Sequence, residues 1–205
     1  MKTIERNEIK HFEIQCEKRS FCKCLLINYC KHANITPQQK ELFAKAKELC
    51  QRVTKWLYGE RKFNSLLIQG GVGTGKTTLF KALIDTKVIL DEQEFKHNLT
   101  NFTRAVRLND ENLLPEGLID FYAERKGLVI DDMGSEEPVV KSWGREYRPM
   151  ERILKRRSDD KLPTIVTTNL SLEQVRVQYN SDRLADVLAQ YDILTLNNPQ
   201  SFRRL

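Results

Sequence analysis

The chain lacks any apolar run that approaches the roughly 20 residues needed to cross a membrane. Its first residues also lack the apolar core of a signal peptide, because Lys2, Glu5 and Arg6 place charges of both signs there. These absences exclude the common membrane-spanning and secreted classes of protein. We therefore expect a cytoplasmic protein that has no membrane partner.

Paired C-x-x-C knuckles are missing as well, although the chain has five cysteines. An odd number of cysteines in a reducing compartment indicates thiols or metal ligands and not disulfides. A single residue separates Cys22 from Cys24, and Cys30 from His32, which is unusual for a tetrahedral zinc site. A zinc site and buried free thiols both remain open, and we expect less than one zinc per chain. The possible ligands are His11, Cys16, Cys22, Cys24, Cys30 and His32.

The length of 205 residues allows one well-buried α/β domain with an appendage and is short for two full domains. Residues 1–60 contain no clear strand-like run, so we interpret them as a helical appendage that could bind a partner. Residues 61–205 contain the strand-like runs and are the expected main domain. Within the appendage, Thr36 and Pro37 predict the start of a helix and Gly59 predicts its end.

The segment from 70 to 77 fits the phosphate-binding pattern G-x-x-x-x-G-K-[ST] at every fixed position. An apolar run at 65–69 precedes it and a helical pattern follows it, which is the context that the motif requires. We expect Lys76 to bind the β- and γ-phosphates of ATP and Thr77 to bind Mg²⁺. The expected nucleotide-binding residues are Gly70, Gly71, Val72, Gly73, Thr74, Gly75, Lys76, Thr77 and Thr78.

A second apolar run, at 127–130, ends in the two carboxylates Asp131 and Asp132. A buried parallel strand delivers its last residues to the sheet edge at which the phosphate loop also lies. We expect Asp131 to hold Mg²⁺ and Asp132 to polarise the attacking water. Glu136 and Glu137 follow closely, and either of them could have that catalytic role instead.

A β-branched run at 163–168 ends in Asn169, whose amide could bind the γ-phosphate or orient the water. The alternation of strands with helical patterns predicts an α/β fold, a P-loop NTPase with a parallel sheet of about five strands flanked by helices. The further elements that we expect are strands at 87–90 and 192–196 and helices at 92–107, 115–124, 171–178 and 181–190.

Basic and apolar residues both recur at helical spacing between 139 and 157. Pro149 pushes Arg148 out of the α region, so we expect two helices or a kink. The net charge of +6 permits contact with nucleic acid without requiring it. The cations could line a nucleic-acid backbone or form a solvated face, which is the commoner outcome. They are Arg145, Arg148, Arg152, Lys155, Arg156 and Arg157.

The order of these motifs resembles the AAA+ ATPases of the DnaC-type helicase-loader family, with the IstB transposition helpers as close relatives. The resemblance covers about residues 60–205. It rests on the phosphate loop, on Ile-Asp-Asp-Met-Gly-Ser-Glu at 130–136, on Thr-Thr-Asn-Leu-Ser at 167–171 and on Ser-Phe-Arg near the end of the chain. The phrases at 130–136 and 167–171 are more specific to the family than the phosphate loop.

The resemblance implies roles for several residues. Asn169 would be the sensor-1 residue, and Arg203, or Arg204 beside it, would be the sensor-2 residue. Arg183 would be the arginine finger that acts on a neighbouring subunit's ATP if the alignment is anchored on the Asp-Arg-Leu phrase around it. If the preceding Tyr-Asn is the anchor, Val187 falls at that position instead.

The resemblance also implies a function. It indicates an ATP-hydrolysing protein of DNA replication, a loader that acts on a replicative helicase and single-stranded DNA and self-associates on binding ATP or DNA. The alternatives are a transposition helper that binds duplex DNA and a transposase, and a nucleotide-gated adaptor with weak hydrolysis. The N-terminal segment shows no match that identifies a partner.

Overall fold

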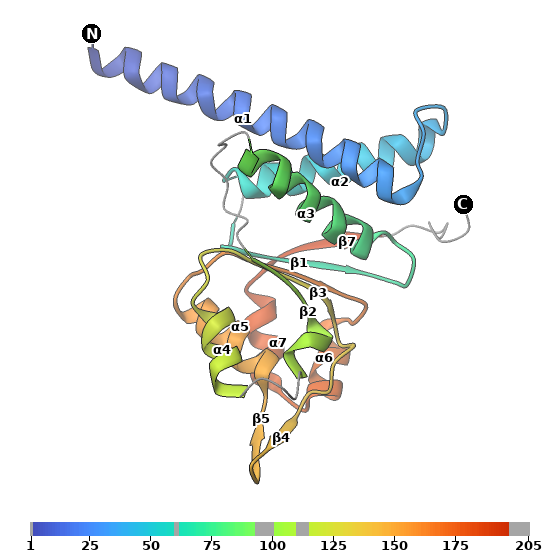
Figure 1. The fold of residues 1–205 in the computed structure, drawn as a ribbon, viewed down its shortest axis with the longest axis vertical. Helices are drawn as coiled ribbons and strands as arrows, with labels where there is room; N and C mark the ends of the chain where they lie inside the picture. Colours follow the sequence, from blue (N-terminus) through green and yellow to red (C-terminus); the bar gives the residue numbers. More distant parts are fainter. Residues whose placement is uncertain (1, 60–61, 93–100, 110–114, 197–205) are drawn as a thin grey trace. The chain divides into compact units, whose positions relative to one another are not determined.

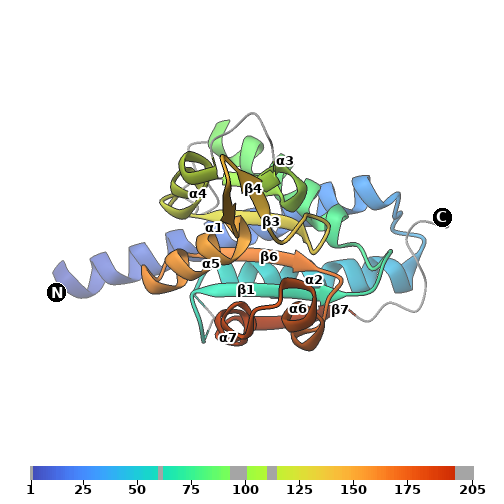
Figure 2. The ribbon, with the colours of Figure 1, turned by 90° about the horizontal axis from the view of Figure 1, so that it is seen from below.

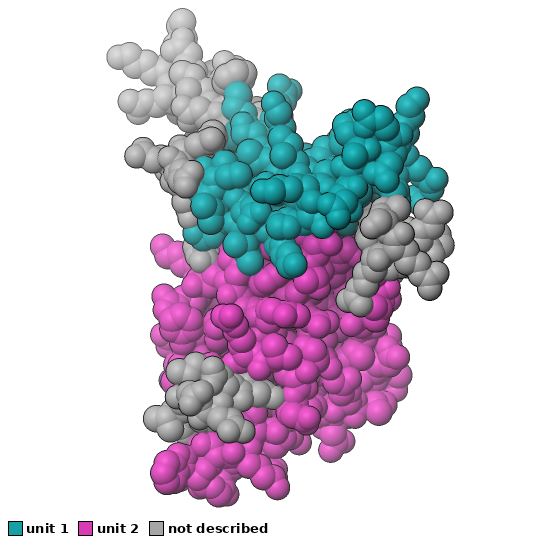
Figure 3. All heavy atoms as spheres, turned by 45° about the vertical axis from the view of Figure 1, so that its right-hand side comes forward, with its two compact units in different colours: residues 1–61, 81–97 teal, residues 62–80, 98–205 magenta. Residues whose placement is uncertain are grey.

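The structure is a computed structural model, which describes residues 2–59, 62–92, 101–109 and 115–196 (Figure 1). By their internal contacts the residues form two compact units, 1–61 with 81–97 and 62–80 with 98–205 (Figure 3). The sequence did not predict that 81–97 would group with the N-terminal helices. The division into domains at residue 60 stays a prediction.

The first unit is helical. It contains α1 (Lys2–Ala33), α2 (Lys40–Leu57) and most of α3 (Lys76–Glu92). Phe21, Leu25 and Tyr29 are buried at four-residue steps along α1, so one face of this helix forms the core of the unit. Two polar contacts join α1 to α3. Asn28 donates to the hydroxyl of Thr86 at 3.1 Å, and the ring nitrogen Nε2 of His32 lies 2.8 Å from a carboxylate oxygen of Asp85. The predicted helical N-terminal segment is confirmed.

The second helix begins later than its sequence predicts. The backbone N–H of Thr36 donates to the side chain of Gln39, and the N–H of Gln39 donates to the carbonyl of Thr36 at 3.0 Å. These bonds close a turn around Pro37, and α2 starts at Lys40. Its predicted end is confirmed, since Gly59 follows the helix with a φ of 99°.

The second unit is built on a parallel sheet of five strands, in the order β2-β3-β6-β1-β7. Figure 2 shows β3, β6, β1 and β7 of this sheet side by side. Near-continuous apolar runs explain the central strands, because a parallel sheet is covered on both faces. The predicted sheet with flanking helices is confirmed. The strands are β1 (Ser65–Gly70), β2 (Asn101–Arg104), β3 (Leu128–Met133), β6 (Thr164–Thr168) and β7 (Asp192–Leu196).

The remaining elements of this unit are short. Leu67, Ile130 and Val166 of the sheet pack with Ile153 and Leu188 of the helices in one buried core. No helix in the described part of the chain has both the length and the apolar character that a membrane crossing requires. The elements are the 3₁₀ turn η1 (Ala105–Asn109), α4 (Pro115–Ala123), the hairpin strands β4 (Val140–Ser142) and β5 (Arg145–Tyr147), α5 (Pro149–Asp159), α6 (Leu172–Tyr179) and α7 (Asp182–Ala189).

Two predicted elements were wrong. The apolar run at 87–90 continues α3 and is no strand, because a short apolar run cannot by itself distinguish a strand from a buried helix. The helix predicted at 92–107 falls partly on 93–100, outside the described residues, and its remainder forms β2 and η1. Pairing of 101–104 with β3 overrides the helical spacing there, since strand formation depends on tertiary context.

The segment before α5 was also predicted wrongly as helix. Residues 140–147 form an antiparallel hairpin, whose turn contains Trp143 and Gly144 at positive φ. The effect of proline was predicted correctly: Pro149 is the first residue of α5, and Arg148 before it has φ −119° and ψ 77°, outside the helical region.

Candidate nucleotide site

Three segments with polar residues meet at one edge of the sheet. Because β3, β6 and β1 are parallel neighbours, their carboxyl ends lie side by side. The phosphate loop follows β1, the two aspartates end β3, and Asn169 follows β6. The edge therefore brings together Lys76, Thr77, Asp131, Asp132 and Asn169, although their roles stay predictions.

The phosphate loop turns on glycines at the positions where the backbone needs them. Gly73 and Gly75 have φ values of 83° and 96°, which side chains rarely tolerate. The buried ammonium of Lys76 donates to the carbonyls of Gly70 at 2.6 Å and Gly71 at 2.9 Å, so the lysine lies against its own loop. Thr77 and Thr78 follow in the first turn of α3, where the helix N-terminus favours an anion.

Asp131 is fully buried, with an exposed fraction of 0%. One carboxylate oxygen accepts a hydrogen bond from Thr167 at 2.7 Å, whereas the other has no hydrogen-bond partner among the described residues. Burial raises the pKa of Asp131 and Asp132 adds to this, while Thr167, Thr77 and Arg104 act in the opposite direction. A buried carboxylate oxygen beside a threonine hydroxyl suits a hard cation such as Mg²⁺.

A β-bulge sets the geometry of the aspartate pair. From Ile130 to Met133 the chain advances three residues on β3 against two on β6, so one extra residue is inserted. Asp132 has a φ of 64° and its N–H donates to Thr167 at 3.0 Å. The hydroxyl of Thr167 thus connects both aspartates. A positive φ in a non-glycine residue, as at Asp132, is a common feature of functional sites.

The structure brings Asp132 and Asn169 together. The amide of Asn169 lies 3.4 Å from a carboxylate oxygen of Asp132, and the Asn169 side chain is exposed. Ser135 caps the same turn by donating to the carbonyl of Asp132 at 2.6 Å. A carboxylate and an amide in direct contact can both bind the same water molecule beside them.

Glu136 is buried, and its two oxygens have partners in α6 and in the loop after β3. One accepts from the Tyr179 hydroxyl and the other from the N–H of Gly134 at 2.9 Å. Burial raises the pKa of Glu136, and it raises that of Tyr179 as well. These contacts favour a role in ordering the loop over a catalytic one. Glu137, the other alternative, is exposed.

The arginines that the family resemblance singled out are placed differently from one another. Arg183 is exposed in the first turn of α7, without a partner among the described residues. Val187 is buried in the core of the unit. An alignment that puts the finger position at Val187 would therefore assign it to a core residue. Arg203 and Arg204 lie outside the described residues.

The six cations between Arg145 and Arg157 do not form one basic face. Arg148 is half-buried and donates to a backbone carbonyl, Lys155 contacts an acid one turn on, and Arg156 contacts Asp120 at 2.6 Å and Glu124 at 2.8 Å. Of this group, Arg145 and Arg152 remain exposed and without a carboxylate partner among the described residues. The six cations therefore cannot act together as one path for a nucleic-acid backbone, and only Arg145 and Arg152 keep an exposed charge that no carboxylate of the described residues pairs.

Arg157 is fully buried, and burial lowers its pKa to about 10. Its guanidinium donates to the hydroxyl of Thr164 at 2.8 Å and to four backbone carbonyls, three of them just at or after the end of α4. The side chain therefore satisfies carbonyls that a helix end leaves without partners. The carbonyls belong to Tyr122, Ala123, Arg125 and Pro163.

The described residues contain no group of three or more His, Cys, Asp and Glu that could hold a metal ion. Cys16 is exposed, Cys22 and Cys24 are half-buried, and Cys30 is buried, which raises the pKa of its thiol. The side chain of His11 is outside the described set. The expected zinc content stays a prediction.

No protein-family model matches the chain, and no curated protein matches its sequence. Solved structures do match. The crystal structure of DnaI aligns with a TM-score of 0.51 and 19% identity over 77% of this chain and 82% of that one. The crystal structure of the DnaC helicase loader aligns with a TM-score of 0.51 and 18% identity over 74% of this chain and 90% of that one. The chain has the fold of DnaC-type AAA+ ATPases.

The AAA+ fold is also that of AMPPCP-bound DnaA from Aquifex aeolicus, which aligns with a TM-score of 0.50 and 16% identity over 76% of this chain. This chain spans about half of that protein, 48% of its length. In parallel α/β sheets, ligands bind at the carboxyl ends of the strands, which is the edge where the phosphate loop and the aspartates meet here.

Sequence patterns missed two residues of this edge. Arg104 lies at the end of β2 with its guanidinium 4.0 Å from Asp131, in a segment that was predicted as helix. Thr167 was noted as part of a β-branched run and of the phrase at 167–171, without a role of its own. A hydroxyl on the strand between the phosphate loop and the aspartates is a signal that could have identified it.

Proposed function

We propose that this protein is an ATP-hydrolysing loader of a replicative helicase, which acts with single-stranded DNA. The observation that carries the proposal is the fully buried oxygen of Asp131 that has no hydrogen-bond partner among the described residues, with only the Arg104 guanidinium 4.0 Å away, at the edge that holds the phosphate loop. A buried carboxylate with an open coordination position is costly unless a cation occupies it. Asp131 and Thr77 would hold Mg²⁺, which supplies positive charge to the phosphates of ATP.

The chain's own residues can then perform hydrolysis by positioning charge. Lys76 would exchange its two loop carbonyls for phosphate oxygens, keeping charge-assisted hydrogen bonds in both cases. Asp132 would accept the proton of the attacking water or orient it, while the Asn169 amide fixes the carboxylate. Phosphoryl transfer needs little covalent chemistry from the protein, so this arrangement is sufficient.

The proposed partners follow from the structural neighbours. One neighbour is a DnaC helicase loader, and another is the replication initiator DnaA bound to AMPPCP and single-stranded DNA, with a TM-score of 0.50 and 16% identity. Self-association on nucleotide binding is proposed because Arg183 is exposed, as a residue that acts on a neighbouring subunit must be. Sensor 2 would be Arg203 or Arg204.

The first experiment tests nucleotide binding. Lys76→Ala should weaken ATP binding about 10- to 150-fold in titration calorimetry, because a charge-assisted donor is worth roughly 1.5–3 kcal/mol. Lys81→Ala is the matched control, since Lys81 is an exposed lysine one turn further along the same helix. Equal affinity in the Lys76 variant would reject the phosphate-loop assignment.

The second experiment tests loading. The replicative helicase of the same cell, circular single-stranded DNA, Mg²⁺ and ATP are mixed with the protein, and helicase on the circles is quantified after gel filtration. Loading by the wild type that is lost in Lys76→Ala supports the proposal. A preference for duplex with no effect on helicase indicates a transposition helper, and ATP binding without turnover or DNA binding indicates a protein adaptor.

A further inference from the structure

The hairpin of β4 and β5 carries the most exposed large apolar side chain in the described part of the chain. Trp143 at its tip is 90% exposed. The two strands pair in register from Val140 with Tyr147 to Ser142 with Arg145, and Figure 1 shows the hairpin projecting away from the sheet of its own unit. None of the residues assigned to ATP hydrolysis lies on it.

The turn makes a tryptophan at this position costly. Trp143 and Gly144 are the two residues of the connection, and both have positive φ, 51° and 75°, as a type I′ turn requires. Asn-Gly is the favoured sequence there, and a bulky side chain at positive φ is an outlier. The tryptophan is neither favoured by the turn nor buried by packing, so contact with a ligand is the remaining use for it.

The base of the hairpin is fixed although its tip is exposed. Tyr147 is buried, and the guanidinium of Arg152 lies 5.7 Å from the centre of its ring. Tyr147 is followed by Arg148, which donates to the carbonyl of Tyr179 at 2.7 Å. The hairpin therefore presents Trp143 from an anchored support, which lowers the entropy lost when the tip binds.

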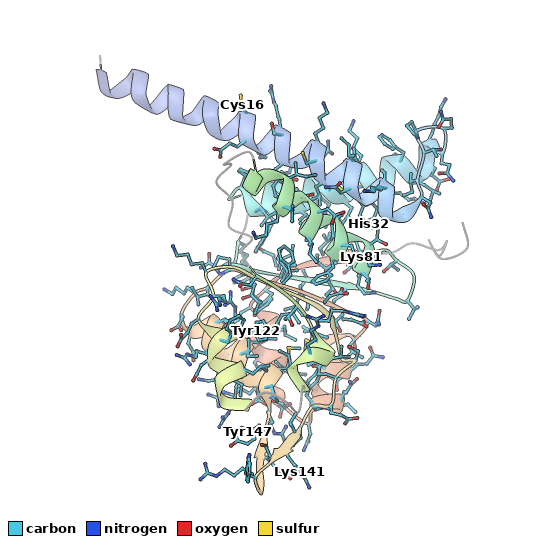
Figure 4. The ribbon with its side chains drawn as sticks, viewed as in Figure 1. Cys16, His32, Lys81, Tyr122, Lys141 and Tyr147 are labelled. Carbon is cyan, nitrogen blue, oxygen red and sulfur yellow. The ribbon has the colours of Figure 1, made fainter. Side chains whose placement is uncertain are left out.

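Each strand of the hairpin carries a cation close to the tip, Lys141 on β4 (labelled in Figure 4) and Arg145 on β5. Arg145 is exposed without a carboxylate partner among the described residues. Lys141 is 79% exposed, and its contact with Glu146 at 3.7 Å is a surface ion pair that contributes little and competes weakly with a polyanion. The tip thus combines an aromatic face with positive charges. In the sequence, polar Ser142 separates Lys141 from Trp143, and Gly144 separates Trp143 from Arg145.

We propose that Trp143 stacks on an unpaired base of single-stranded DNA while Lys141 and Arg145 contact phosphates beside that base. This inference rests on the proposed function and names the element that would bind the strand. A polyanion with exposed π-faces matches an aromatic residue flanked by cations. Duplex DNA stacks its bases against one another and offers no free face, and a protein-binding centre would have apolar neighbours around the tryptophan.

Binding is measured by fluorescence anisotropy of a labelled oligo-dT with ATP present. Trp143→Asn creates the favoured Asn-Gly turn, so it removes the aromatic ring while supporting the hairpin. It should weaken binding about 5- to 100-fold, in line with the effect of losing one stacked base, whereas Trp143→Phe should stay within about threefold of the wild type. Lys141→Gln and Arg145→Gln should each flatten the log-log salt slope by about 0.7.

Intrinsic fluorescence gives a second readout on the unmodified protein. The chain has two tryptophans, and Trp56 is 4% exposed within the helical unit. Quenching of the exposed residue by unlabelled oligo-dT should therefore disappear in Trp143→Phe, although that variant still binds. Quenching that persists in this variant would show that the strand contacts another part of the chain.

The outcomes separate this inference from the proposed function. If wild type binds oligo-dT and Trp143→Asn binds equally well, the hairpin assignment is wrong and the loader proposal stands. If wild type binds no single strand with ATP or ADP, the inference and the DNA part of the proposed function both fail. A Trp143→Asn protein that binds DNA normally but no longer captures the helicase would identify the tip as a protein contact and overturn the inference.

Discussion

Replacing Thr167 by valine removes one hydroxyl from the centre of the nucleotide site and changes the side-chain volume little. The hydroxyl donates to the buried Asp131 at 2.7 Å and accepts from the N–H of Asp132 at 3.0 Å. In Thr167→Val one carboxylate oxygen of Asp131 and the N–H of Asp132 lose these partners. Because Asp131 is fully buried, water cannot replace the lost donor.

The expected loss of stability follows from the two bonds. A hydrogen bond to a charged group contributes about 1.5–3 kcal/mol and a neutral one about 1 kcal/mol, so the free energy of unfolding at pH 7.5 should fall by about 3 kcal/mol. Urea denaturation followed by circular dichroism measures this change. Mg²⁺-dependent ATP turnover should fall as well, since Thr167 positions the carboxylate proposed to hold the metal.

The loss should depend on pH. Burial already raises the pKa of Asp131 above its ordinary 3.8, and Thr167 opposes that rise. A folded-state pKa that is raised gives stability at low pH that is lost as the pH rises through it. Removing Thr167 raises this pKa further, so the variant should lose more stability between pH 4 and pH 7.5 than the wild type does. At pH 4 its deficit should shrink toward about 2 kcal/mol, because a protonated Asp131 needs less support.

Thr168→Val is the matched control for this experiment. Thr168 is equally buried on the same strand, and its hydroxyl donates to the carbonyl of Met133 at 2.8 Å and accepts from the N–H of Leu170 at 3.1 Å. Both partners are neutral, so its loss of about 2 kcal/mol should be the same at both pH values. Equal pH dependence of the two variants, or no destabilisation in Thr167→Val, would refute the assignment of Thr167 as the support of an ionised Asp131.

Three further outcomes are expected. Asp132→Asn should keep ATP affinity within about tenfold and cut single-turnover hydrolysis about 100-fold or more, whereas Glu136→Gln should lose stability and keep more of its turnover; the reverse order would exchange their roles. Arg156→Ala should leave the salt slope of single-strand binding unchanged, because the charge of Arg156 is already paired with two acids. A flatter slope in this variant would show that Arg156 contacts a DNA phosphate. Elemental analysis of protein purified without chelator should find less than one zinc per chain, and a full equivalent that is lost together with folding in Cys22→Ser or Cys30→Ser would show a structural zinc site.

The phosphate loop and the edge of the sheet could be predicted because local patterns specify them. Fixed letters define the loop, and the run before Asp131 is apolar throughout, as a buried parallel strand must be. No sequence pattern, however, indicates that the chain inserts an extra residue at Asp132, because a bulge depends on how β3 is aligned with β6.

The hairpin and β2 could not be predicted for a related reason. The cations from Arg145 to Arg157 recur at helical spacing, yet the positive φ at Trp143 and Gly144 turns the chain back on itself. Gly144 was the available signal for that turn. The ion pairs of these cations could not be predicted either, since the acids that pair with Arg156 lie more than 30 residues away in the sequence.

The buried guanidinium of Arg157 has a consequence for the kinetics of unfolding. Its acceptors lie as far as 35 residues away along the chain, at the end of α4 and at the start of β6. The complete set of hydrogen bonds can form only after both segments are in place, so we expect most of this stabilisation to arise after the folding transition state. A shorter side chain at this position should therefore accelerate unfolding much more than it slows folding. The Arg157 side chain would thus lengthen the time that the folded domain survives between openings.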